Sequence, residues 1–505
     1  MKFYIENFIL SLIFFFLLIL NYYQVNTQSF GFIIDQDWTI IYNSLLATSG
    51  FEQEYRDHPA YTTFLLYGIC LKIINFFFFD LNLNILNILD DKNPEKNLQN
   101  IFICLRIINS IVIFLIYFLL FKTLKLFNIP IFYRVFTLLF FLFFESIYQL
   151  LFLLRSEALS VLLFLASNYF LLKYLKENLK KKYVVFSALF FTLSILTKTQ
   201  IILLFLGSPF IFLFLKQRFI KKQNKIDITT KFYNKILYLF GFFVILATAY
   251  LYIKYPAPTD LFFFTTYFII YLIFHNFFEK INYTKIKEII DFVLLFVLGI
   301  FLTFVIVASL DLLNIIRFDY EIILTSFARP ITHMSIFPGL YNISENNFLL
   351  ILNKIINHIS NLSEIKYIFI KNKFIICFIP IIYYCLIKKK FNKNLLYIFI
   401  LFCNLIFITS IFTFFRDVSY YQIYLIPITL LIIIELVLLD NKKTLFVLCI
   451  LFFAVINFQV TKGRIAEGFL GERTVIKLCG YSKENWNMIN ATVKNYEKFQ
   501  TTICQ

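Results

Sequence analysis

Residues 59–79 read Pro59-Ala60-Tyr61-Thr62-Thr63-Phe64-Leu65-Leu66-Tyr67-Gly68-Ile69-Cys70-Leu71-Lys72-Ile73-Ile74-Asn75-Phe76-Phe77-Phe78-Phe79, a mainly apolar run with one charged side chain. A helix needs about 20 such residues to cross the ~30 Å hydrocarbon layer of a bilayer, so this run can either span a membrane or lie along its surface. The two choices place every later segment on opposite sides of the membrane. This stretch therefore decides the fold.

The composition of the whole chain requires a membrane. Its 505 residues are 60% hydrophobic, 21% aromatic and only 15% charged, whereas soluble globular proteins have about 25% charged residues. This balance excludes a soluble enzyme, a fibre and a disordered chain. The apolar runs are continuous rather than alternating, which excludes a transmembrane β-barrel. Because helices satisfy their own backbone polar groups in lipid, we expect an all-α, polytopic membrane protein.

The other apolar runs predict the membrane spans. The first is 7–23, and no small-residue cleavage site follows it, so it is interpreted as an uncleaved helix rather than a signal peptide. The further expected spans are 101–121, 131–148, 157–172, 184–197, 199–215, 236–253, 260–278, 289–309, 374–387, 395–412, 422–439 and 444–459. With 59–79 at the interface, the chain has about 13 spans.

The charged residues favour this interfacial placement. The chain has 47 Lys and Arg against 30 Asp and Glu, a formal charge of +17. With 59–79 outside the hydrocarbon core, the basic clusters fall into short cytoplasmic loops, among them 180–182, 221–225 and 388–390. Cytoplasmic loops of membrane proteins carry such an excess. The N-terminus is then cytoplasmic, the C-terminus lies outside, and the positive charge is an orientation signal that implies no nucleic acid.

Two organisational units follow. Residues 1–460 form the transmembrane domain, with large outer loops at 24–100 and 310–372, and 461–505 form a small non-cytoplasmic tail. Two substantial outer loops indicate a protein that acts on something at the outer face. Cys479 and Cys504 lie in the tail, where they either pair as a disulfide or remain thiols.

The first outer loop contains the acidic triplet Asp35-Gln36-Asp37. Asp37 is expected to cap a short helix that Gly50 ends. An Asp-x-Asp pair at a membrane edge can bind a divalent cation, or it can divide into a catalytic base and a helix cap. We therefore take Asp35 and Asp37 as the candidate catalytic residues, with the metal left unknown.

Further candidates lie near the expected outer ends of spans. Cations there either bind an anionic substrate or snorkel to the interface as helix-end charges. Glu157 is either a second carboxylate for a metal or for the acceptor, or the partner of Arg155 in an ion pair. Arg416 either binds substrate or forms a surface ion pair with Asp417. The candidate substrate- and phosphate-binding residues are Arg106, Arg155, Glu157, Lys198, Arg416, His58 and Tyr420.

The order of these motifs resembles the GT-C superfamily of membrane glycosyltransferases, and most closely its protein O-mannosyltransferase and aminoarabinose-transferase branch. The matching elements are Asp35 to Asp37, Gly50, His58-Pro59, Arg106, Thr197-Lys198 and Arg416 through Pro427. The likeness covers roughly 1–215 and 413–440. The chain departs from the family pattern in two places: the usual Asp-Glu pair is Asp35-Gln36, and the usual Pro-Pro is His58-Pro59.

The resemblance implies transfer of a sugar from a polyprenyl-phosphate donor to a hydroxyl of a lipid, glycan or protein acceptor. An Asp of the first loop would act as base and the anomeric carbon would invert, while cations at the membrane edge stabilise the lipid-phosphate leaving group. The one candidate cofactor is a divalent cation. The expected location is a bacterial inner membrane, with the site on the periplasmic side; the alternative is the endoplasmic reticulum of a eukaryote with an A+T-rich genome.

Two other functions fit the same topology. An O-antigen polymerase or ligase would centre on the 310–372 loop, where Arg329 and His333 occur. A transporter or flippase of lipid-linked sugars would need an inverted repeat and many polar residues inside spans, and neither is visible. The sequence has no Walker loop, G-x-G-x-x-G, H-E-x-x-H or C-x-x-C motif.

Overall fold

A computed structural model describes residues 2–27, 37–51, 53, 60–77, 81–89, 94–177, 180–198, 201, 286–313, 315, 401 and 419–439. Within these residues the regular secondary structure is entirely helical, as the sequence predicts. The helices are α1 Lys2–Thr27, α2 Asp37–Thr48, α3 Tyr61–Phe77, α4 Ile85–Leu89, α5 Pro94–Leu126, α6 Ile131–Leu142, α7 Glu145–Phe152, α8 Ser156–Lys176, α9 Lys182–Thr197, α13 Ile286–Leu312, the 3-10 helix η2 Ser419–Leu425 and α20 Ile426–Leu439.

Three of these helices are long and apolar enough to cross a membrane: Glu6–Tyr23 of α1, Lys96–Leu126 of α5 and Ser156–Lys176 of α8. The expected spans 236–253, 260–278, 374–387 and 444–459, almost all of 310–372 and the tail 461–505 lie outside the described residues, as do 199–215 except for residue 201 and 395–412 except for residue 401. The structure therefore supports a membrane protein, and the number of 13 spans stays a prediction.

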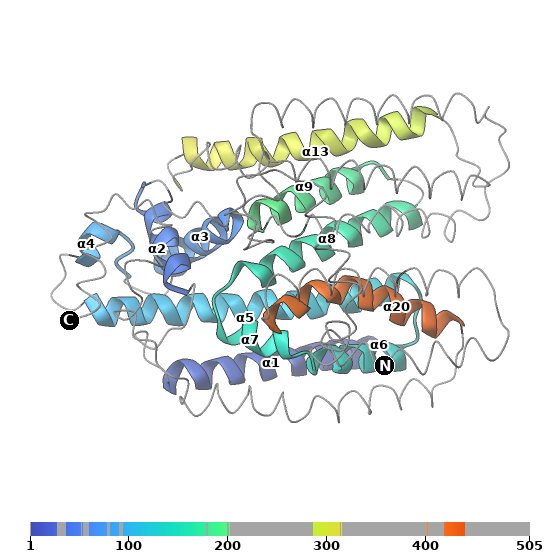
Figure 1. The fold of residues 1–505 in the computed structure, drawn as a ribbon, viewed down its shortest axis with the longest axis horizontal. Helices are drawn as coiled ribbons and strands as arrows, with labels where there is room; N and C mark the ends of the chain where they lie inside the picture. The colour runs from blue at the N-terminus through green and yellow to red at the C-terminus, as the bar shows by residue number, and fades with distance from the viewer. Residues whose placement is uncertain are drawn as a thin grey trace, which may run out of the picture.

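The long helices lie side by side (Figure 1). Helix α13 packs on α9, α9 on α8, α8 on α5, and α5 on α1. Helices α1 and α5 run antiparallel, because Glu6 contacts Lys125 at one end while Asn21 donates a hydrogen bond to the Arg106 carbonyl at the other. The short helices α2, α3 and α4 gather at the end where α5 begins (Figure 1).

An ion-pair cluster fixes the opposite end of this layer. Glu6 Oε1 lies 2.8 Å from Arg134 Nη1 and Glu6 Oε2 lies 2.8 Å from Lys125 Nζ, so one carboxylate ties α1 to α5 and α6. The Arg134 guanidinium also lies 4.9 Å from the centre of the Phe121 ring. In the turn between α8 and α9, Tyr183 donates a hydrogen bond to Glu177, which together with Lys173 and Lys180 lowers the pKa of that carboxyl.

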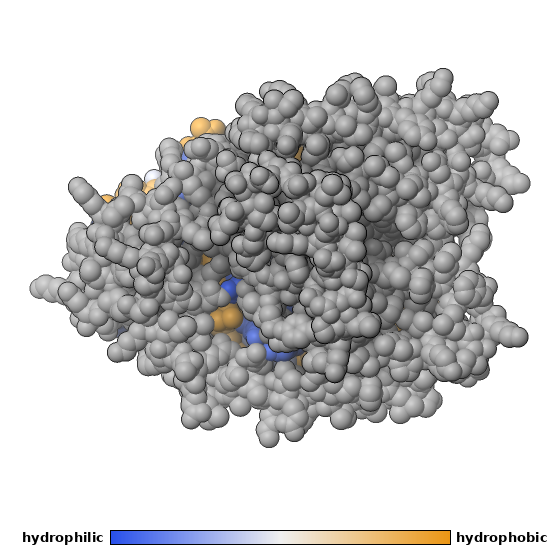
Figure 2. All heavy atoms as spheres, viewed as in Figure 1, coloured by the Kyte–Doolittle hydropathy of each residue, from blue (hydrophilic) through white to orange (hydrophobic). Residues whose placement is uncertain are grey.

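Apolar side chains on the outer faces remain exposed, as expected for helices that contact lipid. Along α1 they recur every three or four residues, at Tyr4, Phe8, Leu12, Phe15, Ile19 and Tyr22. Tyr4 and Tyr22 stand at the two ends of this stripe, the positions that aromatic residues favour at membrane interfaces. Hydrophobic residues also lie at the surface along one edge of the molecule in Figure 2.

Two predicted helices differ from expectation. The run 131–148 is two helices, α6 and α7, bent by 62° at a short break. Glu145 begins α7, and a carboxylate is stabilised at a helix N-terminus, which favours a new start there. The run 422–439 begins in η2 and becomes α-helical only at Ile426. Pro427 has no N–H to donate and suits the first turn of a helix.

The decisive stretch 59–79 forms α3, which has 17 residues. At 1.5 Å per residue it is about 25 Å long, short of the hydrocarbon thickness. It is not one of the three candidate spans, and it packs against α2, α5 and α9. The 16-residue α9 belongs to the same group of shorter apolar helices, so the interfacial placement of α3 stays a prediction.

Candidate functional site

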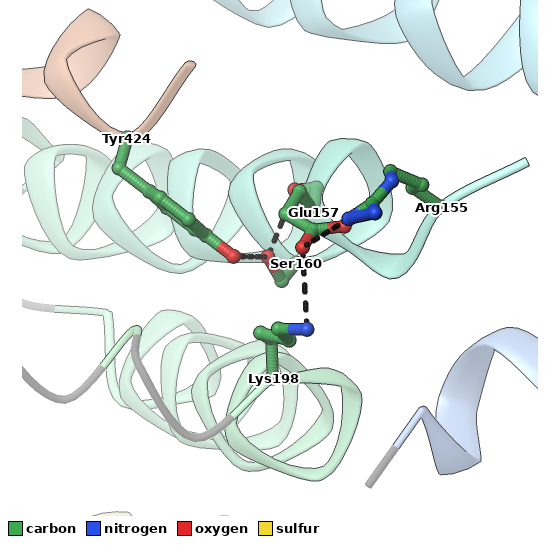
Figure 3. Close-up of polar contacts among 5 residues, drawn as sticks. All are labelled: Arg155, Glu157, Ser160, Lys198 and Tyr424. Atoms are coloured by element: carbon green, nitrogen blue, oxygen red, sulfur yellow. Dashed lines mark hydrogen bonds and ion pairs between the residues drawn. The ribbon is translucent and has the colours of Figure 1, made fainter. Parts of the chain in front are cut away.

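Three charged side chains that the sequence analysis selected meet inside the protein (Figure 3). Glu157 Oε1 lies 3.2 Å from Lys198 Nζ and 3.5 Å from Arg155 Nη1. None of the three residues is more than 2% exposed. We call Arg155, Glu157 and Lys198 the charged cluster.

The break between α7 and α8 places the first two members. Helix α7 ends at Phe152, and the chain is extended at Leu153 and at Arg155, the N-cap of α8. Glu157 follows in the first turn of α8. The N-terminus of a helix carries a partial positive charge, which stabilises a carboxylate at that position.

Lys198 comes from the end of the neighbouring helix. It is the C-cap of α9, in extended backbone conformation, and its N–H donates to the Ser194 carbonyl. A cation is favoured at this end of a helix. Because α8 and α9 are antiparallel neighbours, the start of one and the end of the other bring opposite charges together.

Two serines fix the alignment of these helices. Ser194 Oγ donates to the Ser160 carbonyl at 2.7 Å, which joins α9 to α8. Ser160 Oγ lies 2.8 Å from the Glu157 carbonyl and 3.5 Å from Tyr424 Oη. Tyr424 belongs to η2, so a segment distant in the sequence reaches Ser160 next to the cluster (Figure 3).

The electrostatics of the charged cluster favour an anionic ligand. Burying a charge costs several kcal/mol unless it is paired, so Glu157 offsets part of the burial cost of both cations. The three side chains still carry a formal charge of +1 together. Glu157 Oε2 is buried, and no residue in the described part of the chain hydrogen-bonds to it. The cluster could therefore bind an anion through its cations and a hydroxyl donor through this oxygen.

Arg106 is also buried, but its visible contacts are structural. Its guanidinium carbon lies 4.7 Å from the centre of the Phe102 ring. Its carbonyl accepts a hydrogen bond from Asn21, which holds α1 against α5, and another from Ser110 within α5. A further hydrogen bond joins Asn21 to the Ser110 hydroxyl.

The remaining predicted residues are placed only in part. Asp37 begins α2, and Gly50 follows that helix with φ +82°, as the sequence predicts for a helix-ending glycine. Tyr420 lies in η2, but its side chain and that of Asp37 are not described. Asp35, His58 and Arg416 lie outside the described residues. In the described ranges no group of three His, Cys, Asp or Glu side chains could hold a metal ion.

Sequence reasoning missed three residues around the cluster. Ser160 lies one helical turn after Glu157, a spacing that puts both on one face of α8 and could have been noticed. Tyr424 lies one turn beyond the selected Tyr420. Asn109 has no such signal, because its hydrogen-bond partners lie in α3, in α7 and in the segment after α7.

No protein-family model, curated protein or solved structure matches the chain.

Proposed function

We propose that this protein is an integral membrane glycosyltransferase of GT-C type that moves a sugar from a polyprenyl-phosphate donor to an acceptor hydroxyl. The proposal includes the topology of about 13 spans with a cytoplasmic N-terminus and a periplasmic C-terminus in a bacterial inner membrane. The observation that carries it is the charged cluster: three residues selected as substrate ligands are buried together where the start of α8 meets the end of α9.

In this proposal the charged cluster receives the donor's phosphate. Arg155 and Lys198 stabilise the negative charge that grows on the lipid phosphate as its bond to the sugar breaks. Glu157 holds both cations in position and offers Oε2 to a hydroxyl of the substrate. Interactions of this kind are strong in a site from which water is excluded, and all three side chains are buried.

The first loop supplies the base. Asp35 or Asp37 accepts the proton of the acceptor hydroxyl as its oxygen attacks the anomeric carbon from the face opposite the phosphate, with inversion. Helix α2, which begins at Asp37, packs on α3, and α3 packs on α9 near Lys198. This arrangement supports a first loop that works at the same end of the bundle as the charged cluster.

The test is sugar transfer in vesicles that contain the full-length protein, with a labelled polyprenyl-phosphate sugar and a cell-envelope extract as acceptor. The variants are Asp35→Asn and Asp37→Asn. We expect one of them to reduce transfer by about 10³-fold, the loss typical of a removed general base. Undiminished transfer by both variants would refute the first-loop mechanism.

A further inference from the structure

We propose that α3 sets the separation of the two cations in the charged cluster, with Thr62 and Tyr67 acting as positioning residues through the backbone on either side. Neither cation lies within a regular helix. Arg155 and Lys198 are helix caps with extended backbone, at φ −138° and −157°. The positions of these caps depend on the hydrogen bonds made by the segments that precede them.

The Arg155 segment is held through Asn109. The last carbonyls of a helix have no partner within that helix. Asn109 Nδ2 lies 2.5 Å from the Leu150 carbonyl in the last turn of α7 and 3.2 Å from the Leu153 carbonyl, two residues before Arg155. The Tyr67 hydroxyl of α3 donates to Asn109 Oδ1 at 3.4 Å. Tyr67 thereby orients the amide that fixes this segment.

The Lys198 segment is held by the first turn of the same helix. Thr62 Oγ1 donates to the Leu193 carbonyl at 2.9 Å, in the last turns of α9. The same carbonyl accepts a hydrogen bond from the hydroxyl of Thr197, the residue before Lys198. Tyr61 and Leu65 of α3 also pack with Leu196 in one apolar cluster. The first turns of α3 therefore contact the end of α9 directly.

Helix α3 thus bridges both cation-bearing segments. It is also joined to α2, since Ile41, Leu45, Phe64 and Tyr67 belong to one apolar cluster. Its far end is exposed, with Phe76 and Phe77 the most open residues on the helix. Movement of this interfacial helix would therefore change the distance between Arg155 and Lys198. Helix α3 thus positions the two cations in addition to packing against its neighbours.

The test measures how fast the Lys198 amine is acetylated by acetic anhydride in the folded, full-length protein in lipid nanodiscs, followed by mass spectrometry. In the native protein Lys198 is buried and paired, so its reaction is slow. We expect Thr62→Val and Tyr67→Phe to raise its rate about fivefold, the effect of losing one net hydrogen bond. Thr62→Ser keeps the hydroxyl and should restore the native rate.

Matched controls separate positioning from general loosening. Thr63→Val and Tyr117→Phe each remove a buried hydroxyl that has no hydrogen-bond partner in the described part of the chain. Both should leave Lys198 as slow as in the native protein, and the exposed Lys125 at the opposite end should react equally in all variants. An unchanged Lys198 rate in both test variants, or an equal rise in the controls, would overturn the proposal. The assay uses no sugar donor, so its result is independent of the proposed transferase activity.

Discussion

Lys198 Nζ lies 3.2 Å from Glu157 Oε1, and both side chains are buried. The pair joins the last residues of α9 to the first turn of α8, while Arg155 contacts the same carboxylate oxygen from the other side. One carboxylate thus holds two buried cations that would otherwise repel each other. Its removal should affect both the stability of the bundle and the affinity of the site for anions.

Glu157→Gln tests the structural part of that statement. The substitution keeps the shape of the side chain but leaves two buried cations without their shared counter-charge, and breaking a buried pair costs about 3–5 kcal/mol. We expect the free energy of unfolding in detergent to fall by about this amount. Glu177→Gln, at a largely exposed ion pair in the turn between α8 and α9, is the control and should lower the free energy of unfolding far less. An equal loss of unfolding free energy in the two variants would contradict the stabilising role of Glu157 in the charged cluster.

Gly299 provides a test of the packing of α13 on α9. A Cβ at this position would lie 2.6 Å from both Ala188 Cβ and the Val185 carbonyl oxygen, distances that require the helices to move apart. Small residues at such contacts let helices approach closely in membranes. Gly299→Ala should destabilise the protein by about 1–3 kcal/mol, measured by chemical unfolding. Ser309→Ala, on an exposed part of the same helix, should have little effect, and an equally silent Gly299→Ala would show that this close approach is wrong.

The topology can be tested with reporters that are active on only one side of the membrane. A reporter fused after residue 79 should report the outer face, because α3 is expected to lie along the outer interface. A reporter inserted at residues 178–179, among the lysines of the turn between α8 and α9, should report the cytoplasm. A cytoplasmic signal after residue 79 would contradict the interfacial placement of α3 and the orientation of every later span.

The sequence predicts helices well where a long apolar run has polar residues at both ends. The runs 157–172 and 184–197 match α8 and α9 closely, because lysines and polar residues flank both. The break at residues 143–144 was not predicted, since the apolar run continues through it and the signal is a single acidic residue, Glu145. Periodicity cannot show such a break, which depends on packing around the bend.

The individual residues of the candidate site could be predicted from the sequence, but the contacts between them could not. Glu157 and Arg155 are close in the sequence, so their ion pair was one of the two roles considered for Glu157. The contact between Lys198 and Glu157 depends on how far α9 slides along α8, and the bond from Ser194 to Ser160 that fixes this alignment has no sequence signature. The support from Asn109 is likewise a property of the packed helices.

The most direct test of the central claim is the rate of sugar transfer from a labelled polyprenyl-phosphate donor by Lys198→Met, compared with Lys176→Met in identical vesicles. Lys198→Met removes a buried cation of the charged cluster, whereas Lys176 is exposed at the far end of α8 and donates to the Leu126 carbonyl. If Lys198 stabilises the departing lipid phosphate, its variant should transfer sugar at least about 10²-fold more slowly, while Lys176→Met keeps the native rate. Native transfer by Lys198→Met would contradict the assignment of the charged cluster as the donor phosphate site.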